Sequence, residues 1–146
     1  MRILIAEDDR LSRTFLEEFM KGYGTCDSAE DGMTTLDYFL DSLKNNEPYD
    51  LLCLDIMMPK VDGLKVLNVI RGLEKQHQVP VDQHLKVIMM TAIADMEYVD
   101  RAFQLGCDAY ASKPIDTDKV LEVMQNLKLI RSEERRVGKE CLRLCR

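Results

Sequence analysis

The stretch Leu51-Leu52-Cys53-Leu54-Asp55 is a run of four apolar residues that ends at an acidic side chain. A short apolar run with polar borders is typical of a strand that is buried on both faces of a parallel sheet. Comparable runs lead into Glu7 and Asp8, into Thr91 and into Lys113. The sequence therefore predicts several buried strands, each of which ends at a residue with a reactive side chain.

Segments with helical periodicity separate these runs, so strands and helices alternate along the chain. We expect strands at about residues 2–6, 24–28, 50–54, 86–90 and 108–111, and helices at about residues 10–21, 31–44, 63–75, 95–105 and 116–129. Strict alternation favours right-handed crossovers with helices on both faces of the sheet. We therefore predict an α/β fold of the flavodoxin-like, doubly wound type, with a five-stranded parallel sheet in the order 2-1-3-4-5 and five helices.

Apolar periodicity also predicts the faces on which the helices pack. The expected packing residues are Leu11, Phe15, Leu16, Phe19 and Met20 in the first helix, and Met33, Leu36, Phe39, Leu40 and Leu43 in the second. The strand near residues 24–28 is the most polar one and is expected at an edge of the sheet. Residues 74–85 are expected to form a long connection without chemistry of its own, in which His77 and His84 are solvated.

Composition and charge limit the class of protein. A chain of 146 residues with 46% apolar and 32% charged residues is typical of one soluble, globular domain. The net charge of −6 argues against nucleic acid as a direct partner, because phosphate binding needs a basic face. No apolar segment approaches the length of about 18 residues that a membrane-spanning helix needs, and the N-terminus lacks the pattern of a signal peptide. We therefore expect a cytoplasmic protein.

The last part of the chain differs from the rest. Residues 131–146 carry six basic and three acidic side chains, whereas residues 1–130 are acidic overall. The segment 131–141 resembles the translation of a common sequencing adapter, so we expect this basic tail to be non-native read-through. The expected domain therefore covers residues 1–130. A native basic tail that binds nucleic acid or a membrane is the less favoured interpretation.

The ends of parallel strands lie along one edge of a sheet, and open α/β sheets place their sites at that edge. The predicted strand ends therefore bring together Glu7, Asp8, Asp55, Thr91 and Lys113. Taken singly, the acids before the first helix could simply cap it, and the other residues are common in turns or on surfaces. Taken together, three acids need a cation or a proton to offset their repulsion, and Mg²⁺ suits an oxygen site of this kind. A carboxylate can also attack phosphorus, so the set predicts a magnesium-dependent phosphoryl site with an aspartate as acceptor.

Four motifs in the chain resemble those of the receiver domains of two-component response regulators. They are Ile3-Leu4-Ile5-Ala6-Glu7-Asp8-Asp9, Leu54-Asp55-Ile56-Met57-Met58-Pro59 with Asp62-Gly63, Met90-Thr91-Ala92, and Lys113-Pro114-Ile115. Each motif is weak alone, but together they are specific and extend the resemblance over residues 2–130. The resemblance implies a CheY-like receiver in a phosphorelay, and the absence of a linker after the last predicted helix favours a stand-alone regulator.

The resemblance implies a role for each matching residue of the acid pocket. Asp55 would be the phosphoacceptor, converted to 4-aspartylphosphate. Asp8, Asp55 and the Met57 carbonyl would ligate Mg²⁺, and Glu7 would contribute through water. Lys113 would contact the phosphoryl group, and the Lys113-Pro114 bond is expected to be cis, which proline permits.

The resemblance also implies partners and a means of output. Thr91 and Tyr110 would be the switch pair, and the small Ala92 would admit the phosphodonor. The donor would be a sensor histidine kinase or a phosphotransfer protein. A downstream target protein would bind the fourth helix, fifth strand and fifth helix, at about residues 95–129. We expect no enzymatic activity other than the domain's own phosphorylation and dephosphorylation.

Two other functions were weighed. An aspartate-nucleophile phosphatase of the haloacid dehalogenase type needs a second acid two residues after the nucleophile, and here that position holds Met57. A receiver-like module that binds partners without phosphorylation would typically lack one of the five functional residues, and all five are present. Both alternatives are therefore less favoured than a phosphorylated receiver.

Overall fold

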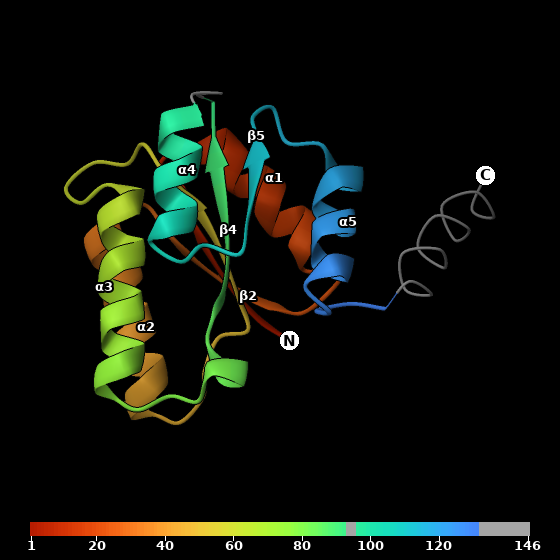
Figure 1. Ribbon diagram of the computed structural model, residues 1–146. Helices are drawn as coiled ribbons and strands as arrows, with labels where there is room; N and C mark the ends of the chain where they lie inside the picture. Colours follow the sequence, from red (N-terminus) through yellow and green to blue (C-terminus); the bar gives the residue numbers. More distant parts are fainter. Residues whose placement is uncertain (93–95, 132–146) are drawn as a thin grey trace.

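The computed structural model describes residues 1–92 and 96–131 of the chain. In these residues, five parallel strands form one sheet in the order β2-β1-β3-β4-β5 (Figure 1). The strands are β1 (Arg2–Ala6), β2 (Thr25–Ala29), β3 (Leu51–Asp55), β4 (Lys86–Thr91) and β5 (Ala109–Ser112). The predicted flavodoxin-like order is confirmed, and the polar strand β2 lies at an edge as expected.

The helices described are α1 (Arg10–Met20), α2 (Gly32–Lys44), α3 (Gly63–Gln76), α4 (Met96–Gln104) and α5 (Thr117–Asn126), and a 3₁₀ turn covers Val81–Gln83. Figure 1 shows α2, α3 and α4 on one side of the sheet and α1 and α5 on the other. Helix α5 ends earlier than predicted, because Lys128 adopts a left-handed backbone conformation with φ of 61°. Asp95, the predicted start of the fourth helix, and residues 132–146 of the tail lie outside the described residues.

The core consists of two apolar layers, one on each face of the sheet. Leu52, Leu54 and Met89 face the layer under α2, α3 and α4, whereas Cys53 and Ile88 face the layer under α1 and α5. All residues of β3 are buried, which explains why its sequence is continuously apolar rather than alternating. The two layers hold the central strands rigidly, so that the residues at their carboxyl ends have fixed positions.

Two predicted packing faces are partly wrong. Leu11 and Phe15 of α1 are 81% and 46% exposed, and Met33 of α2 is 49% exposed. Helix α1 packs on the sheet through Leu16 and Met20, which are buried. Leu11 and Phe15, four residues apart, form a separate row that lies beside the row of Leu16 and Met20 on the helix surface and stays exposed.

The connection in residues 74–85 was predicted to have no obvious chemistry, and the structure shows a structural role for it that the sequence did not indicate. Glu74 is 1% exposed and pairs with Arg71 at 2.7 Å, and its other oxygen accepts a hydrogen bond from the Leu85 backbone N–H. His84 is only partly exposed, since a ring nitrogen lies 2.9 Å from the Val79 carbonyl oxygen, whereas His77 is exposed as predicted. The connection is therefore anchored by a buried carboxylate.

Arg71 extends this anchor to the turn between α4 and β5. Its guanidinium donates hydrogen bonds of 3.0 and 2.8 Å to the Gly106 carbonyl and one of 3.0 Å to Asp108. Asp108 in turn accepts a hydrogen bond from the backbone N–H of Val87 on β4. Glu74, Arg71 and Asp108 thus connect α3, β4 and the start of β5 at the end of the sheet opposite to the acid pocket.

Candidate functional site

The strand register explains why distant residues meet at the carboxyl edge of the sheet. Asp55 is the last residue of β3 and lies opposite Met90, so Thr91 is one position further along β4. Thr91 lies opposite Ser112 of β5, and Lys113 follows Ser112 directly. Glu7 follows β1, whose Ala6 lies opposite Leu54. Glu7, Asp55, Thr91 and Lys113 therefore come together as the sequence predicted.

The centre of the site is an ammonium group between two buried carboxylates. Lys113 Nζ forms an ion pair with Glu7 Oε1 and lies 3.3 Å from Asp55 Oδ2. Glu7 is 1% exposed and Asp55 is 5% exposed, whereas the Lys113 side chain is 19% exposed. A lysine in this position offsets the charge of the two acids and leaves an open side toward solvent.

The proximity of the two acids changes their titration in the metal-free protein. Burial raises the pKa of Asp55 to about 7, and hydrogen bonding with Glu7 and the charge of Glu7 act in the same direction. Burial also raises the pKa of Glu7, but hydrogen bonds with Asp55 and Lys113 outweigh it and hold that pKa below its ordinary value. Burial lowers the pKa of Lys113, yet the two carboxylates outweigh this effect and raise it. Near neutral pH, a proton therefore resides on Asp55 in part of the molecules.

Glu7, Asp8 and Asp55 form a group that fits a divalent cation. One carboxylate oxygen from each lies within 4.8 Å of the other two. Asp8 is exposed, so an ion held there would keep part of its water shell, as Mg²⁺ prefers. The cation would also relieve the repulsion between the acids that raises the pKa of Asp55. The donor set therefore suits a hard, oxygen-loving ion.

The loop after Asp55 is held close to the strand end. The Met57 backbone N–H donates a hydrogen bond of 3.2 Å to Asp55 Oδ1, which fixes the orientation of the carboxylate. The Gly63 N–H donates to the Ile56 carbonyl at 2.8 Å, and a Cβ on Gly63 would lie 2.3 Å from the Asp55 carbonyl oxygen. Only glycine allows this approach, so Gly63 positions Asp55. The motif contained Gly63, but its steric role could not be seen in the sequence.

The two predicted switch residues lie in different environments. Thr91 is buried at the end of β4, whereas Tyr110 of β5 is 40% exposed and packs edge-to-face on Phe103 of α4, with ring centroids 6.2 Å apart. The Lys113-Pro114 peptide bond is cis, as expected. Tyr110 therefore lies on the surface formed by α4 and β5.

A site that the sequence did not indicate adjoins Lys113. A hollow of about 290 Å³ is lined by Leu11, Ser12, Phe15, Lys113, Pro114 and Ile115. The exposed apolar residues of α1 thus lie beside the acid pocket instead of in the core. The sequence contained one indication of this hollow, because α1 carries more apolar residues than a single buried stripe needs.

Two kinds of comparison with known proteins agree with this geometry. The family model of the response regulator receiver domain matches residues 3–125, so the chain belongs to that family. The chain is 34% identical to the transcriptional regulatory protein DltR of Streptococcus agalactiae, over 94% of this chain and 58% of DltR. It is 32% identical to the chemotaxis protein CheY of Treponema pallidum, over 83% of this chain and 78% of CheY. The chain thus spans little more than half the length of DltR.

The fold is shared with solved structures of receiver domains. A CheX-CheY-BeF3-Mg complex from Borrelia burgdorferi matches with a TM-score of 0.74 and 25% identity, over 87% of this chain and 88% of that chain. In this protein, no helix of residues 1–92 and 96–131 has the length and hydropathy needed to cross a bilayer. The chain is therefore a receiver domain of a two-component system, with a five-stranded parallel sheet that presents an acid pocket.

Proposed function

We propose that this receiver domain is switched by phosphorylation of Asp55. The observation that supports it is the placement of the Asp55 carboxylate, 3.3 Å from the Lys113 ammonium and within 4.8 Å of the acids Glu7 and Asp8. In the reaction, an Asp55 oxygen forms a bond to phosphorus while the bond from phosphorus to a histidine nitrogen of the donor breaks. The donor imidazole keeps the electron pair of that bond, and Asp55 becomes an acyl phosphate.

The surrounding residues hold and orient the reacting groups. Asp8, Asp55 and the Met57 carbonyl would ligate Mg²⁺, with Glu7 acting through water, and the bound ion would offset charge on the phosphoryl oxygens. Lys113 would contact the transferred group, and the buried Glu7 keeps its ammonium in position. The Met57 N–H fixes the Asp55 oxygen that it contacts, so the other oxygen is available for attack.

The donor would be a sensor histidine kinase or a phosphotransfer protein. The exposed Leu11 and Phe15 and the neighbouring Ile115 give it an apolar surface directly beside the acid pocket. A protein that docks there would bring a phosphohistidine to Asp55 without covering α4. The small Ala92 would leave room for the donor.

The output would involve Thr91 and Tyr110. A phosphoryl group on Asp55 would draw the Thr91 hydroxyl toward it, and Tyr110 would move from its exposed place on Phe103 into the space that is vacated. The surface of α4, β5 and α5 would then change shape for a downstream target protein. Such a change needs only a small free-energy difference between two states.

Incubation of the full chain with acetyl phosphate and Mg²⁺ tests this proposal. Mass spectrometry should detect one added phosphoryl group that is lost at alkaline pH, as expected of an acyl phosphate. Asp55→Asn should abolish the addition, because an amide is a far poorer nucleophile, whereas Asp62→Asn, in the loop after the pocket, should keep it. Labelling of Asp55→Asn at an unchanged level would contradict the assignment, because another residue would then accept the phosphoryl group. Absence of labelling in the native chain would favour a phosphorylation-independent binding module.

The extent and location of the functional unit are also part of the proposal. Residues 1–130 would form the receiver, and the basic tail 131–146 would be non-native read-through. The chain spans 58% of DltR, so the activity of any longer native protein stays a prediction. A cytoplasmic location follows if the donor is the kinase domain of a two-component system.

A further inference from the structure

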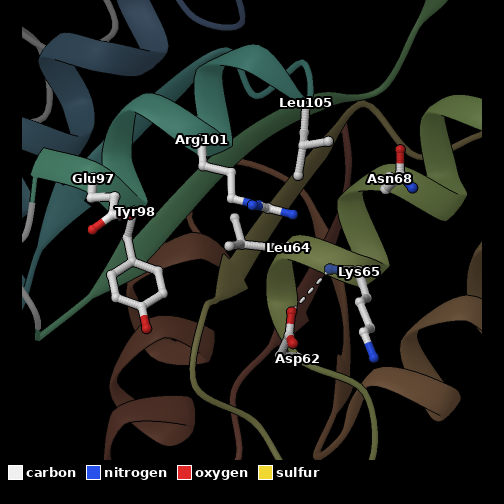
Figure 2. A pocket seen from close by; sticks show the side chains of 8 residues that line it. All are labelled: Asp62, Leu64, Lys65, Asn68, Glu97, Tyr98, Arg101 and Leu105. Atoms are coloured by element: carbon white, nitrogen blue, oxygen red, sulfur yellow. Dashed lines mark hydrogen bonds between the residues drawn. The ribbon is translucent and has the colours of Figure 1, made fainter.

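A hollow between α3 and α4 lies outside the acid pocket (Figure 2). Its volume is about 490 Å³, which is within the range of pockets that hold small molecules. Leu64 of α3 and Leu105, which follows α4, provide its apolar part. Tyr98 and Arg101 of α4 line the opposite side. The hollow thus combines apolar surface with charged side chains of both signs: Lys65 and Arg101, and Asp62 and Glu97.

A second hollow of about 460 Å³ continues the first toward the loop after Asp55. It shares Asp62, Leu64 and Tyr98 with the first hollow and adds Ile56, Met57 and Met58. The two hollows form one groove, which we call the α3–α4 groove, with Arg101 toward one end and the two methionines at the other. Met57 and Tyr98 are exposed, whereas Met58 is buried, and a flexible methionine beside a tyrosine ring adapts readily to apolar ligands.

Of the two cations among the described residues that line the groove, Lys65 and Arg101, only Arg101 points into it. Figure 2 shows its guanidinium between Leu64 and Leu105, whereas the Lys65 ammonium points away. The Arg101 side chain forms no hydrogen bond or ion pair with another residue in the part of the chain that the structure describes. A guanidinium held over apolar side chains without a counter-charge favours an anionic partner.

Neither of the acids that line the groove, Asp62 and Glu97, forms an ion pair with Arg101. Asp62 Oδ1 accepts a hydrogen bond of 3.0 Å from the Lys65 backbone N–H, as the N-cap of α3. Glu97 has an interaction partner of its own, and Figure 2 shows its carboxylate directed away from Arg101. At the end of the groove near Leu105, the Arg101 guanidinium is therefore not paired with either acid.

We propose that the α3–α4 groove binds a small amphiphilic anion. Its carboxylate, sulfonate or phosphate group would pair with Arg101, and its apolar body would lie on Leu64 and Tyr98 toward Met57 and Met58. This site is separate from the phosphorylation of Asp55, because Arg101 and Leu105 take no part in the acid pocket. Binding should occur without Mg²⁺ or a phosphodonor.

A matched pair of fluorescent probes tests this inference on the full chain. Anilinonaphthalene sulfonate carries the anion, whereas N-phenylnaphthylamine has a similar aromatic body without it. We expect saturable binding of the sulfonate at one site, and Arg101→Gln should weaken it about tenfold while the uncharged probe is unaffected. Backbone NMR shifts caused by the sulfonate should involve residues 57, 64, 98, 101 and 105.

Arg10→Gln is the matched control, because Arg10 is exposed at the start of α1 beside the other apolar hollow. It should leave sulfonate binding unchanged. Equal affinity of the native chain for both probes would overturn the proposal without any variant, because it would show that Arg101 attracts no anion. Shifts confined to residues 11, 15 and 115, or a loss of binding in Arg10→Gln alone, would assign the probe to the α1 surface and also overturn it.

Discussion

The Lys113 ammonium lies 3.3 Å from the Asp55 carboxylate and is held there by its ion pair with the buried Glu7. This arrangement is already present without a phosphoryl group, so the cation need not be moved into place during the reaction. A preorganised charge stabilises a transition state more effectively than one that must first be ordered.

Lys113→Met should therefore slow phosphorylation of Asp55 without preventing it. Loss of one preorganised charge in an active site typically costs about 100-fold in rate, and we expect a reduction of that order. The rate of acyl phosphate formation from acetyl phosphate, followed by mass spectrometry, measures it. Lys119→Met on the exposed face of α5 is the control for loss of one positive charge, and similar rates for both variants would contradict a specific role of Lys113.

Asp55→Asn should stabilise the metal-free fold, and the gain should depend on pH. The pKa of Asp55 is raised to about 7 in the folded protein, so above its ordinary pKa of about 4 the folded state retains a proton that the unfolded chain has lost. Rising pH then lowers the free energy of unfolding of the native chain but not of the variant. We expect a gain of about 1–2 kcal/mol at pH near 8 that disappears near pH 4. Urea unfolding at several pH values measures it, and a gain that grows toward acid would show the opposite shift.

Asp8→Ala should weaken Mg²⁺ binding more than Glu7→Gln does. Asp8 is exposed and free to ligate the ion directly, whereas Glu7 is buried and engaged with Lys113. Isothermal titration with Mg²⁺ should show at least a tenfold larger Kd for Asp8→Ala, as expected when a direct ligand is lost. Asp9→Ala is the control, because Asp9 caps α1 through the Ser12 N–H. An unchanged Kd for Asp8→Ala would exclude Asp8 as a ligand.

Thr91→Ala should permit phosphorylation but uncouple it from the α4–β5–α5 surface. The variant lacks the hydroxyl that would move toward the phosphoryl group, so Tyr110 would stay on Phe103. In the native chain, beryllofluoride with Mg²⁺ should shift backbone resonances throughout residues 96–126. In the variant, the shifts should be confined to the acid pocket. If the native chain also showed shifts only near Asp55, the switch proposal would be wrong.

Arg71→Met should destabilise the fold although Arg71 lies far from the acid pocket. The substitution would leave the carboxylate of Glu74, which is 1% exposed, without its partner, and loss of one member of a buried pair costs about 3 kcal/mol. Chemical unfolding measures the loss. Lys75→Met changes a neighbouring exposed cation of the same helix, and its effect should be below about 0.5 kcal/mol. Equal losses in both variants would mean that the network contributes little.

The sequence was sufficient to predict the sheet and to predict which residues lie together at the centre of the site. The apolar run that ends at Asp55 and the comparable run before Glu7 are local patterns, and the rule that parallel strands end at one edge converts them into a spatial prediction. Thr91 and Lys113 could be placed at that edge for the same reason. The order of the strands then followed from the alternation with helices.

Features that depend on contacts between distant residues could not be predicted. The burial of Glu74 requires Arg71 one helical turn before it and the Leu85 N–H from another segment, and no local pattern distinguishes it from an exposed acid. Leu11 and Phe15 have the periodicity of core residues, but they lie on a row of the helix beside the buried row of Leu16 and Met20 and stay exposed. Burial thus depends on which row of the helix faces the sheet, and apolar periodicity alone does not decide between two neighbouring rows.

The two hydrogen bonds from Arg71 to the Gly106 carbonyl have a mechanical consequence for α4. They fasten the chain two residues after the end of the helix, so a displacement of α4 that preserves them is a rotation about that end. A helix of this length extends over about 13 Å, and a rotation of about 10° would move its first turn by about 2 Å while Gly106 stays in place. Helix α4 would then pivot about Gly106. The surface near Tyr98 would move farther than the surface near Phe103, because Tyr98 is farther from the pivot.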